Sequence, residues 1–362
     1  MFALAIIASR PRAAHAQDAV RLPNPDLFAY RQESIPPGSL DGTQPPPPYG
    51  EAPSLTLPGG VNQTPPFSPD PSPIAPPLAG PPTQGAMAMG FGPSSDLPWA
   101  WQVLPTGLMY RSYLAGSKEP RISTSWMTDT HGPFKDPSLT TINPGTVWDS
   151  TLGARVGLLR YGTPNAYRPE GFQIDLTGSA QPRLNPFGTS TPLLTCDYTI
   201  GLPITYARGR WQYKTGYNHL SSHMGDEIMV NNPAYIAQRI NYVRDSIMLG
   251  VGYFATDAMR LFGEVDYALG TEGGAEPIEL QFGIDWSPAH PGGAPFWAIY
   301  TNLRQDFNFG GFFVAQAGWQ WRGGLTLSTL RIGFEYFNGK SAQWETFNQF
   351  EQRVGWGIWY DF

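Results

Sequence analysis

Apolar and polar residues alternate along most of residues 99–362. The segment 330–337 is a clear example, because every second position is apolar and Arg331, Gly333 and Glu335 lie between the apolar residues. A repeat of two places the apolar side chains on one face of a β-strand and the remaining side chains on the other. Many such segments, separated by clusters of Gly, Pro, Asn and Asp, predict an antiparallel all-β domain.

The strands of soluble β-sandwiches also alternate between apolar and polar residues, so three further details decide between a sandwich and a transmembrane barrel. Aromatic residues gather at the ends of the segments, as in the girdles of membrane barrels. Segments of about ten residues suit a tilted span of roughly 25 Å of hydrocarbon. The polar face carries charges well inside the segments: Glu264, Asp266, Asp285, Arg331, Glu335. We therefore predict a transmembrane β-barrel with a polar interior, and a soluble periplasmic β-sandwich stays as an alternative.

Twelve strands are predicted, an even number as in single-chain bacterial outer-membrane barrels. They lie near residues 108–115, 150–160, 170–180, 195–206, 210–220, 244–254, 260–269, 278–286, 295–304, 312–322, 328–337 and 352–362. If both termini are periplasmic, the long gaps are outer loops and the short gaps are inner turns. Inward charges could pair across the lumen and block it, so the sequence leaves open whether the lumen conducts.

The last ten residues, 353–362, alternate apolar residues mainly with glycine and end on Phe362. This ending resembles the C-terminal signal by which outer-membrane barrels are recognised for assembly. The resemblance implies the barrel assembly machinery of a Gram-negative cell as a partner and outer-membrane lipid as the surroundings. The last strand should also pair with the first, because an open sheet edge in lipid would leave backbone groups without hydrogen bonds.

The N-terminal part of the chain has a different composition. Residues 1–16 are predicted to be a secretory signal peptide, because an apolar run is followed by the small-x-small pattern Ala14-His15-Ala16. Residues 17–98 are rich in proline and are predicted to be a disordered linker, since such a stretch cannot build a regular hydrogen-bonded core. The outer-membrane barrel would then occupy residues 99–362.

Charge and cysteine content exclude several classes of function. The formal net charge is -6 at pH 7, and no basic stripe is present, which argues against nucleic acid as a partner. Cys196 is the single cysteine, so neither an internal disulfide nor a cysteine-rich metal site is possible.

The densest polar cluster is the segment 217–227, at the outer end of a predicted strand. His219 and Ser221 share the parity of Tyr217 on that strand and should therefore point toward lipid. This His-x-Ser arrangement resembles outer-membrane phospholipase A, a twelve-strand barrel with such a pair on its lipid-facing wall. The resemblance implies Ser221 as nucleophile and His219 as general base, with Asn241 on the next strand orienting the histidine.

Two other interpretations of the cluster remain open. Polar residues at the rim of a barrel are often solvated and stabilise a turn. A divalent cation such as calcium could bind His223, Asp226 and Glu227, together with His219, if the segment folds back on itself. Carboxylate and histidine ligands suit several metals, but this spacing matches no standard site.

The chain also resembles an uncharacterised bacterial family, catalogued as domain of unknown function 1207. The resemblance covers about the last 260 residues and is carried by five segments: LPTG (104–107), YLAG (113–116), HLSSHMGDE (219–227), FNGKS (337–341) and WYDF (359–362). It implies one domain and no particular activity. We therefore expect an outer-membrane barrel with a structural, binding or narrow transport role, and an interfacial lipid acyl hydrolase as the alternative. The ligand and the oligomeric state stay open.

Overall fold

The computed structural model describes residues 98–130, 145–164, 168–231, 239–290, 292–323 and 328–362, and two short strands between the first two ranges. These strands, β3 (Lys135–Asp136) and β4 (Leu139–Thr140), pair only with each other. The predicted signal peptide (1–16) and nearly all of the predicted linker (17–98) lie outside the described residues.

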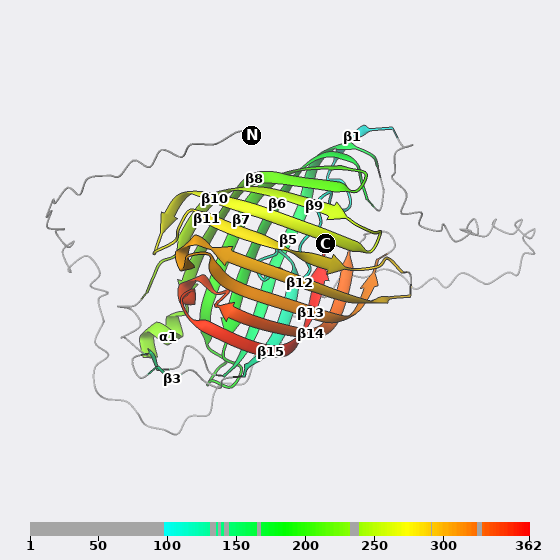
Figure 1. The fold of residues 1–362 in the computed structure, drawn as a ribbon. Helices are drawn as coiled ribbons and strands as arrows, with labels where there is room; N and C mark the ends of the chain where they lie inside the picture. Colours follow the sequence, from blue (N-terminus) through cyan, green and yellow to red (C-terminus); the bar gives the residue numbers. More distant parts are fainter. Residues whose placement is uncertain are drawn as a thin grey trace, which may run out of the picture. The chain divides into compact units, whose positions relative to one another are not determined.

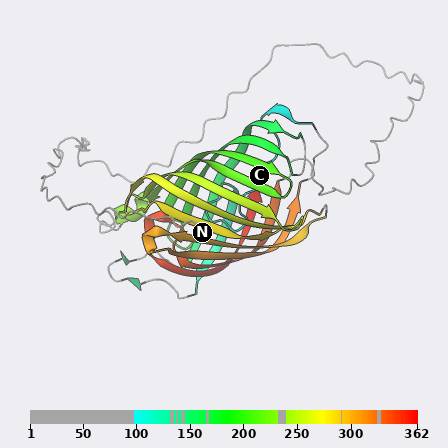
Figure 2. The ribbon, with the colours of Figure 1, turned by 45° about the horizontal axis from the view of Figure 1, so that its top comes forward.

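Twelve antiparallel strands form one closed barrel (Figures 1 and 2). They are β2 (Ile122–Asp129), β5 (Thr146–Gly162), β6 (Gly171–Leu184), β7 (Leu193–Arg208), β8 (Trp211–Met224), β9 (Val243–Phe254), β10 (Met259–Glu272), β11 (Ile278–Trp286), β12 (Ala294–Arg304), β13 (Gly310–Arg322), β14 (Thr329–Lys340) and β15 (Phe350–Asp361). Each of these strands pairs with the next one of the twelve along the chain, which confirms the predicted antiparallel barrel of twelve strands.

The barrel closes between its last and first strands, as predicted. β15 pairs with β2 from Tyr360 opposite Ile122 to Arg353 opposite Asp129. Trp126 lies at this seam, and its ring stacks on that of Trp356 at 4.5 Å between centroids. Closure leaves neither strand with a free edge along this length, which is the condition for a β-sheet surrounded by lipid.

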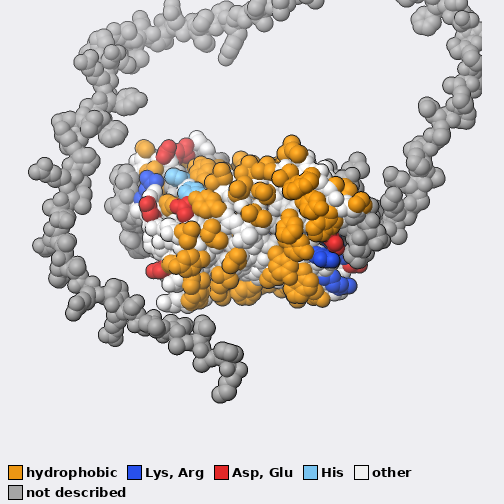
Figure 3. Space-filling view, turned by 90° about the horizontal axis from the view of Figure 1, so that it is seen from above, with side chains coloured by type: hydrophobic (Ala, Val, Ile, Leu, Met, Phe, Trp, Pro, Cys, Tyr) orange, Lys and Arg blue, Asp and Glu red, His pale blue; other side chains and the backbone are white. Residues whose placement is uncertain are grey.

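The wall has an apolar outer face and a polar inner face. On β14, Phe334 is 76% exposed and points outward, whereas Arg331 on the opposite face is 0% exposed. Figure 3 shows hydrophobic side chains covering the middle of the wall and charged side chains toward its two ends. A sandwich would instead bury an apolar layer between two sheets. The structure therefore excludes the alternative of a β-sandwich.

The prediction for the first strand was wrong. Residues 108–115 form no strand, and the first barrel strand is β2, which begins at Ile122. Residues 104–121, which we call the plug, contain no helix or strand, and from residue 107 onward they lie in the lumen, where the inward-facing Arg260 and Arg331 donate to their carbonyls. Met109 and Tyr113 pack inside the barrel and are at most 1% exposed, whereas Leu104 at the start of the plug is 68% exposed. Before the plug, β1 (Ala100–Val103) pairs with the end of β5.

Three of the five predicted inward charges, Glu264, Asp285 and Arg331, are buried and form ion pairs. Asp266 and Glu335 instead accept hydrogen bonds from glutamine side chains. Glu264 accepts from Lys214 at 2.5 Å, and the Arg260 guanidinium lies 2.6 Å from Asp285. Ion pairs along the wall thus replace the predicted pairs across the lumen, because the plug occupies the centre. Three cavities of about 90, 60 and 70 Å³ are found around it.

The two ends of the barrel differ. The end that holds the C-terminus has short connections such as 209–210 and 255–258, and we call it the turn end. The opposite loop end carries α1 (Asp226–Asn231), η3 (Gln305–Phe307) and η4 (Trp344–Thr346). None of the helices in the described part of the chain is long and apolar enough to cross a membrane.

Residues 341–349, which contain η4 and which we call the cap, cover the lumen at the loop end. Trp344 is 1% exposed, and its ring is parallel to that of Tyr242 at 5.3 Å. The guanidinium of Arg304 lies 3.9 Å from the centre of the Trp344 ring. The cap connects β14 to β15 and yet contacts β7 and β8 across the barrel, so it spans the mouth.

Candidate functional site

His219 and Ser221 lie on the outer face of β8 near the loop end, as the parity of the strand predicted. Their neighbours on that face include Tyr217, which is 42% exposed, and the alternate residues Leu220 and Ser222 are buried on the inner face. The side chain of His219 is 34% exposed. Both candidate residues are therefore accessible from outside the wall.

Asp245 on β9 is the partner of the candidate histidine. The register of β8 and β9 places Asp245 directly opposite His219, and its Oδ1 lies 2.8 Å from His219 Nδ1. The hydroxyl of Tyr217 donates to the same carboxylate oxygen. Two outward side chains of β8 thus share one carboxylate of β9. A carboxylate on Nδ1 orients the ring and leaves Nε2 as the nitrogen that can accept a proton.

Ser221 lies two residues beyond His219 on the same face, and its partner on the neighbouring strand β9 is Val243. Among the residues that the structure describes, no hydrogen bond joins the Ser221 hydroxyl to the imidazole. Catalytic hydrogen bonds are often long without substrate and shorten only in the complex. The arrangement therefore contains the side chains of a Ser-His-Asp triad, with the bond from base to acid formed.

Asn241, which was predicted to orient the histidine, lies elsewhere. Its Nδ2 donates to Glu272 Oε2 at 3.2 Å, and its backbone has a positive φ of 52°. Its side chain therefore bonds to the residue that ends β10, while Asp245 contacts the histidine. The sequence did contain a signal for Asp245, because it is a charged residue at an outward position shared with Ile247, Leu249 and Val251.

The predicted metal ligands do not form a cluster. His223 is exposed on the outer face of β8, and Asp226 and Glu227 form the first turn of α1. Within the described ranges, no group of three or more His, Cys, Asp or Glu side chains has a geometry that could hold a metal ion. The proposed divalent cation thus has no preformed set of protein ligands in this part of the chain.

Comparisons with known proteins give a family match and several structural likenesses. A family model described as "Protein of unknown function (DUF1207)" matches residues 151–362. No curated protein matches the chain.

Among solved structures, outer membrane phospholipase A from Escherichia coli is 13% identical. The alignment covers 66% of this chain and 89% of that one, with a TM-score of 0.45. A Salmonella typhi outer membrane phospholipase dimer with bound calcium is also 13% identical, with 66% and 90% covered and a TM-score of 0.46. A Rh. blastica porin mutant is 9% identical, with 67% and 99% covered and a TM-score of 0.29.

Proposed function

Because the chain belongs to the DUF1207 family, whose description assigns no function, we propose from its geometry that it is an integral outer-membrane barrel. The observation that supports this proposal is the belt of outward apolar side chains around a closed wall. Leu249 and Val265 are 61% and 44% exposed in the middle of their strands. Water would not stabilise so continuous an apolar surface, whereas hydrocarbon does. The outer membrane is the location in which bacterial barrels of this kind occur.

Extraction and electrophoresis test this proposal. The protein should sediment with membranes, resist extraction by buffer or high salt, and require detergent. Unheated samples in mild detergent should migrate faster than boiled ones, because the closed barrel stays folded until heated. Release into buffer without detergent would refute the membrane location.

A second candidate function is hydrolysis of lipid acyl esters at the outer rim, and the bond between His219 and Asp245 favours it. His219 would take the proton of Ser221 as Ser221 Oγ bonds to the acyl carbon. The alcohol of the ester would then leave with that proton, and water would release the fatty acid from the serine. Because the three side chains face outward, such an enzyme would meet its substrate in the lipid layer and not in the lumen.

Fatty-acid release from phospholipid in mixed micelles, with and without calcium, tests the hydrolase. Ser221→Ala should abolish release, and Asp245→Asn should lower kcat by about 10³- to 10⁴-fold because the histidine loses its orienting acceptor. Thr215→Ala, on the same outward face of β8, is the matched control and should behave as wild type. Equal release by wild type and Ser221→Ala, or none from wild type with calcium present, would exclude this activity.

A further inference from the structure

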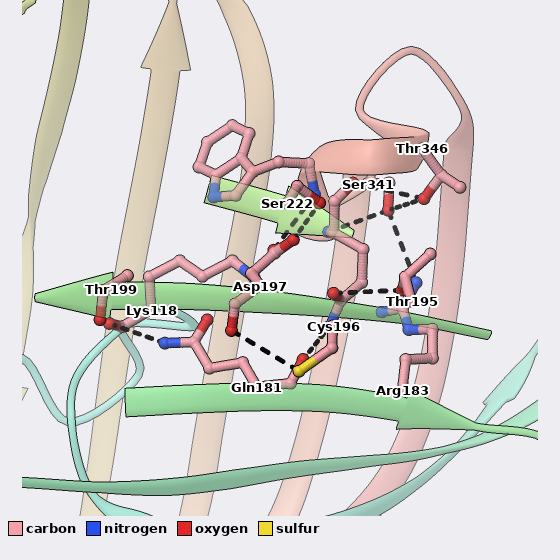
Figure 4. A network of polar contacts seen from close by, with 12 residues as sticks. Lys118, Gln181, Arg183, Thr195, Cys196, Asp197, Thr199, Ser222, Ser341 and Thr346 are labelled. Atoms are coloured by element: carbon pink, nitrogen blue, oxygen red, sulfur yellow. Dashed lines mark hydrogen bonds and ion pairs between the residues drawn. The ribbon is translucent and has the colours of Figure 1, made fainter. Parts of the chain in front are cut away.

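Asp197 on β7 joins the plug, the wall and the cap. It points into the lumen and is 0% exposed. Its carboxylate accepts hydrogen bonds from Lys118 in the plug and from the Ser222 hydroxyl on β8, as Figure 4 shows. It also accepts one from the backbone nitrogen of Trp344 in the cap at 3.2 Å. One buried carboxylate therefore holds three parts of the molecule that are distant in sequence.

Among the described residues, the backbone of the plug bonds to the backbone of β5 only at its two ends, Leu104 and Arg121, and between them its bonds to the wall involve side chains. The guanidinium of Arg260 donates to the carbonyls of Arg111 and Ser112, each at 2.7 Å. That of Arg331 donates to the Leu114 carbonyl at 3.0 Å. A backbone without helix or strand needs such donors when it is buried. Water could replace them, so the plug could leave without breaking a hydrogen bond between neighbouring barrel strands.

The cap depends on the same part of the lumen. Besides its bond to Asp197, it contacts the wall where Thr195 Oγ1 donates to Gln343 Oε1 at 3.2 Å. The ammonium of Lys118 lies 5.9 Å from the centre of the Trp344 ring, so the plug and the cap also contact each other. Moving either segment away would remove a donor from Asp197 and a neighbour from the other segment.

We propose that the lumen is a gated passage for small hydrophilic solutes, kept closed by the plug and the cap, which Asp197 holds together. The inward side chains of the wall include paired charges and amides, as in a water-filled barrel, and apolar ones such as Phe262 and Tyr300, which pack around Tyr113 of the plug. Loss of the Asp197 charge would leave the Lys118 ammonium buried without its counter-charge. A buried unpaired charge is strongly unfavourable, so the lysine should move into water and take the plug with it.

Single-channel recording in planar bilayers with potassium chloride tests the gate. Wild type should be closed for most of the recording, and Asp197→Asn should raise the open probability on the order of a hundredfold. Asp175→Asn is the matched control. Asp175 is also 0% exposed, but its partners Arg155 and Gln173 belong to the wall, so this variant should stay closed.

Labelling of the plug gives a second measurement that does not depend on conductance. A Ser117→Cys probe, in a chain whose buried Cys196 is replaced by alanine, should react with a water-soluble thiol reagent at least about tenfold faster when Asp197 is asparagine. The proposal would be overturned if Asp197→Asn and wild type had the same labelling rate and the same low open probability. An open probability of Asp175→Asn as high as that of Asp197→Asn would also overturn it, because the loss of any buried charge would then open the lumen.

The inference rests on the proposed membrane location, which is tested separately by insertion and migration. Each variant is first checked for insertion into vesicles and for faster migration before boiling. Failure of wild type itself to insert would refute the membrane location and the passage together. Insertion of all variants without any difference in conductance or labelling would refute the gate alone.

Discussion

Replacement of Phe334 with arginine measures whether hydrocarbon surrounds the wall. Phe334 lies in the middle of β14, points outward and is 76% exposed. On a surface bathed by water, such a change stays within about 0.5 kcal/mol. At the midplane of a bilayer, an outward arginine destabilises a barrel by about 2–4 kcal/mol. Since 1.36 kcal/mol is a factor of ten, the folding constant in lipid should fall by roughly 30- to 900-fold.

The depth of the residue provides the control. Leu330 is the second residue of β14, faces outward and lies near the turn end, so Leu330→Arg should cost only about 0–1 kcal/mol. Both variants are unfolded reversibly with guanidinium in lipid vesicles and followed by tryptophan fluorescence and by migration before boiling. Equal losses at the two positions, or a loss below about 0.5 kcal/mol for Phe334→Arg, would refute the reasoning.

Two further predictions concern the cap and the wall. Burial raises the pKa of Glu345, so the carboxylate destabilises the closed cap increasingly as pH rises through that pKa, and acid stabilises it. Glu345→Gln keeps an acceptor for the Ile240 amide and should slow hydrogen exchange of the cap at pH 7; no difference from wild type there would contradict this. Gly333→Ala should cost about 1–3 kcal/mol in refolding, because its Cβ would lie 2.3 Å from the Ala317 carbonyl oxygen. Gly263→Ala, whose nearest neighbour would be 3.9 Å away, is the control, and equal costs would show that the contact is relieved without strain.

Most of the wall could be predicted from the sequence because its pattern is local. On β14, alternate residues must face different solvents, and Leu330 and Arg331 are sufficient to assign the two faces. The same parity put His219 and Ser221 on the outside, and it could do so without knowledge of any partner strand. The final pairing of β15 with the first strand followed from the need to close an edge.

The first strand shows where a local pattern fails. Residues 108–115 contain apolar side chains at positions that suit a strand, and yet Met109, Tyr110 and Tyr113 pack inside the lumen. An apolar residue carries no information on whether lipid or the interior of a barrel will receive it. Only the space left inside twelve strands, and the arginines that bind its carbonyls, make the plug the favourable place for this segment.

The candidate site, too, was predicted in part from the sequence and decided in part by the tertiary structure. The sequence by itself determined that β8 would present His219 and Ser221 outward, since side-chain direction along a strand depends only on parity. Which acidic group meets the histidine depended on the register between β8 and β9, which places Asp245 opposite His219. Contacts between segments far apart in the chain, such as those of Asp197 with Lys118 and Trp344, are likewise decided only by the closed barrel that brings them together.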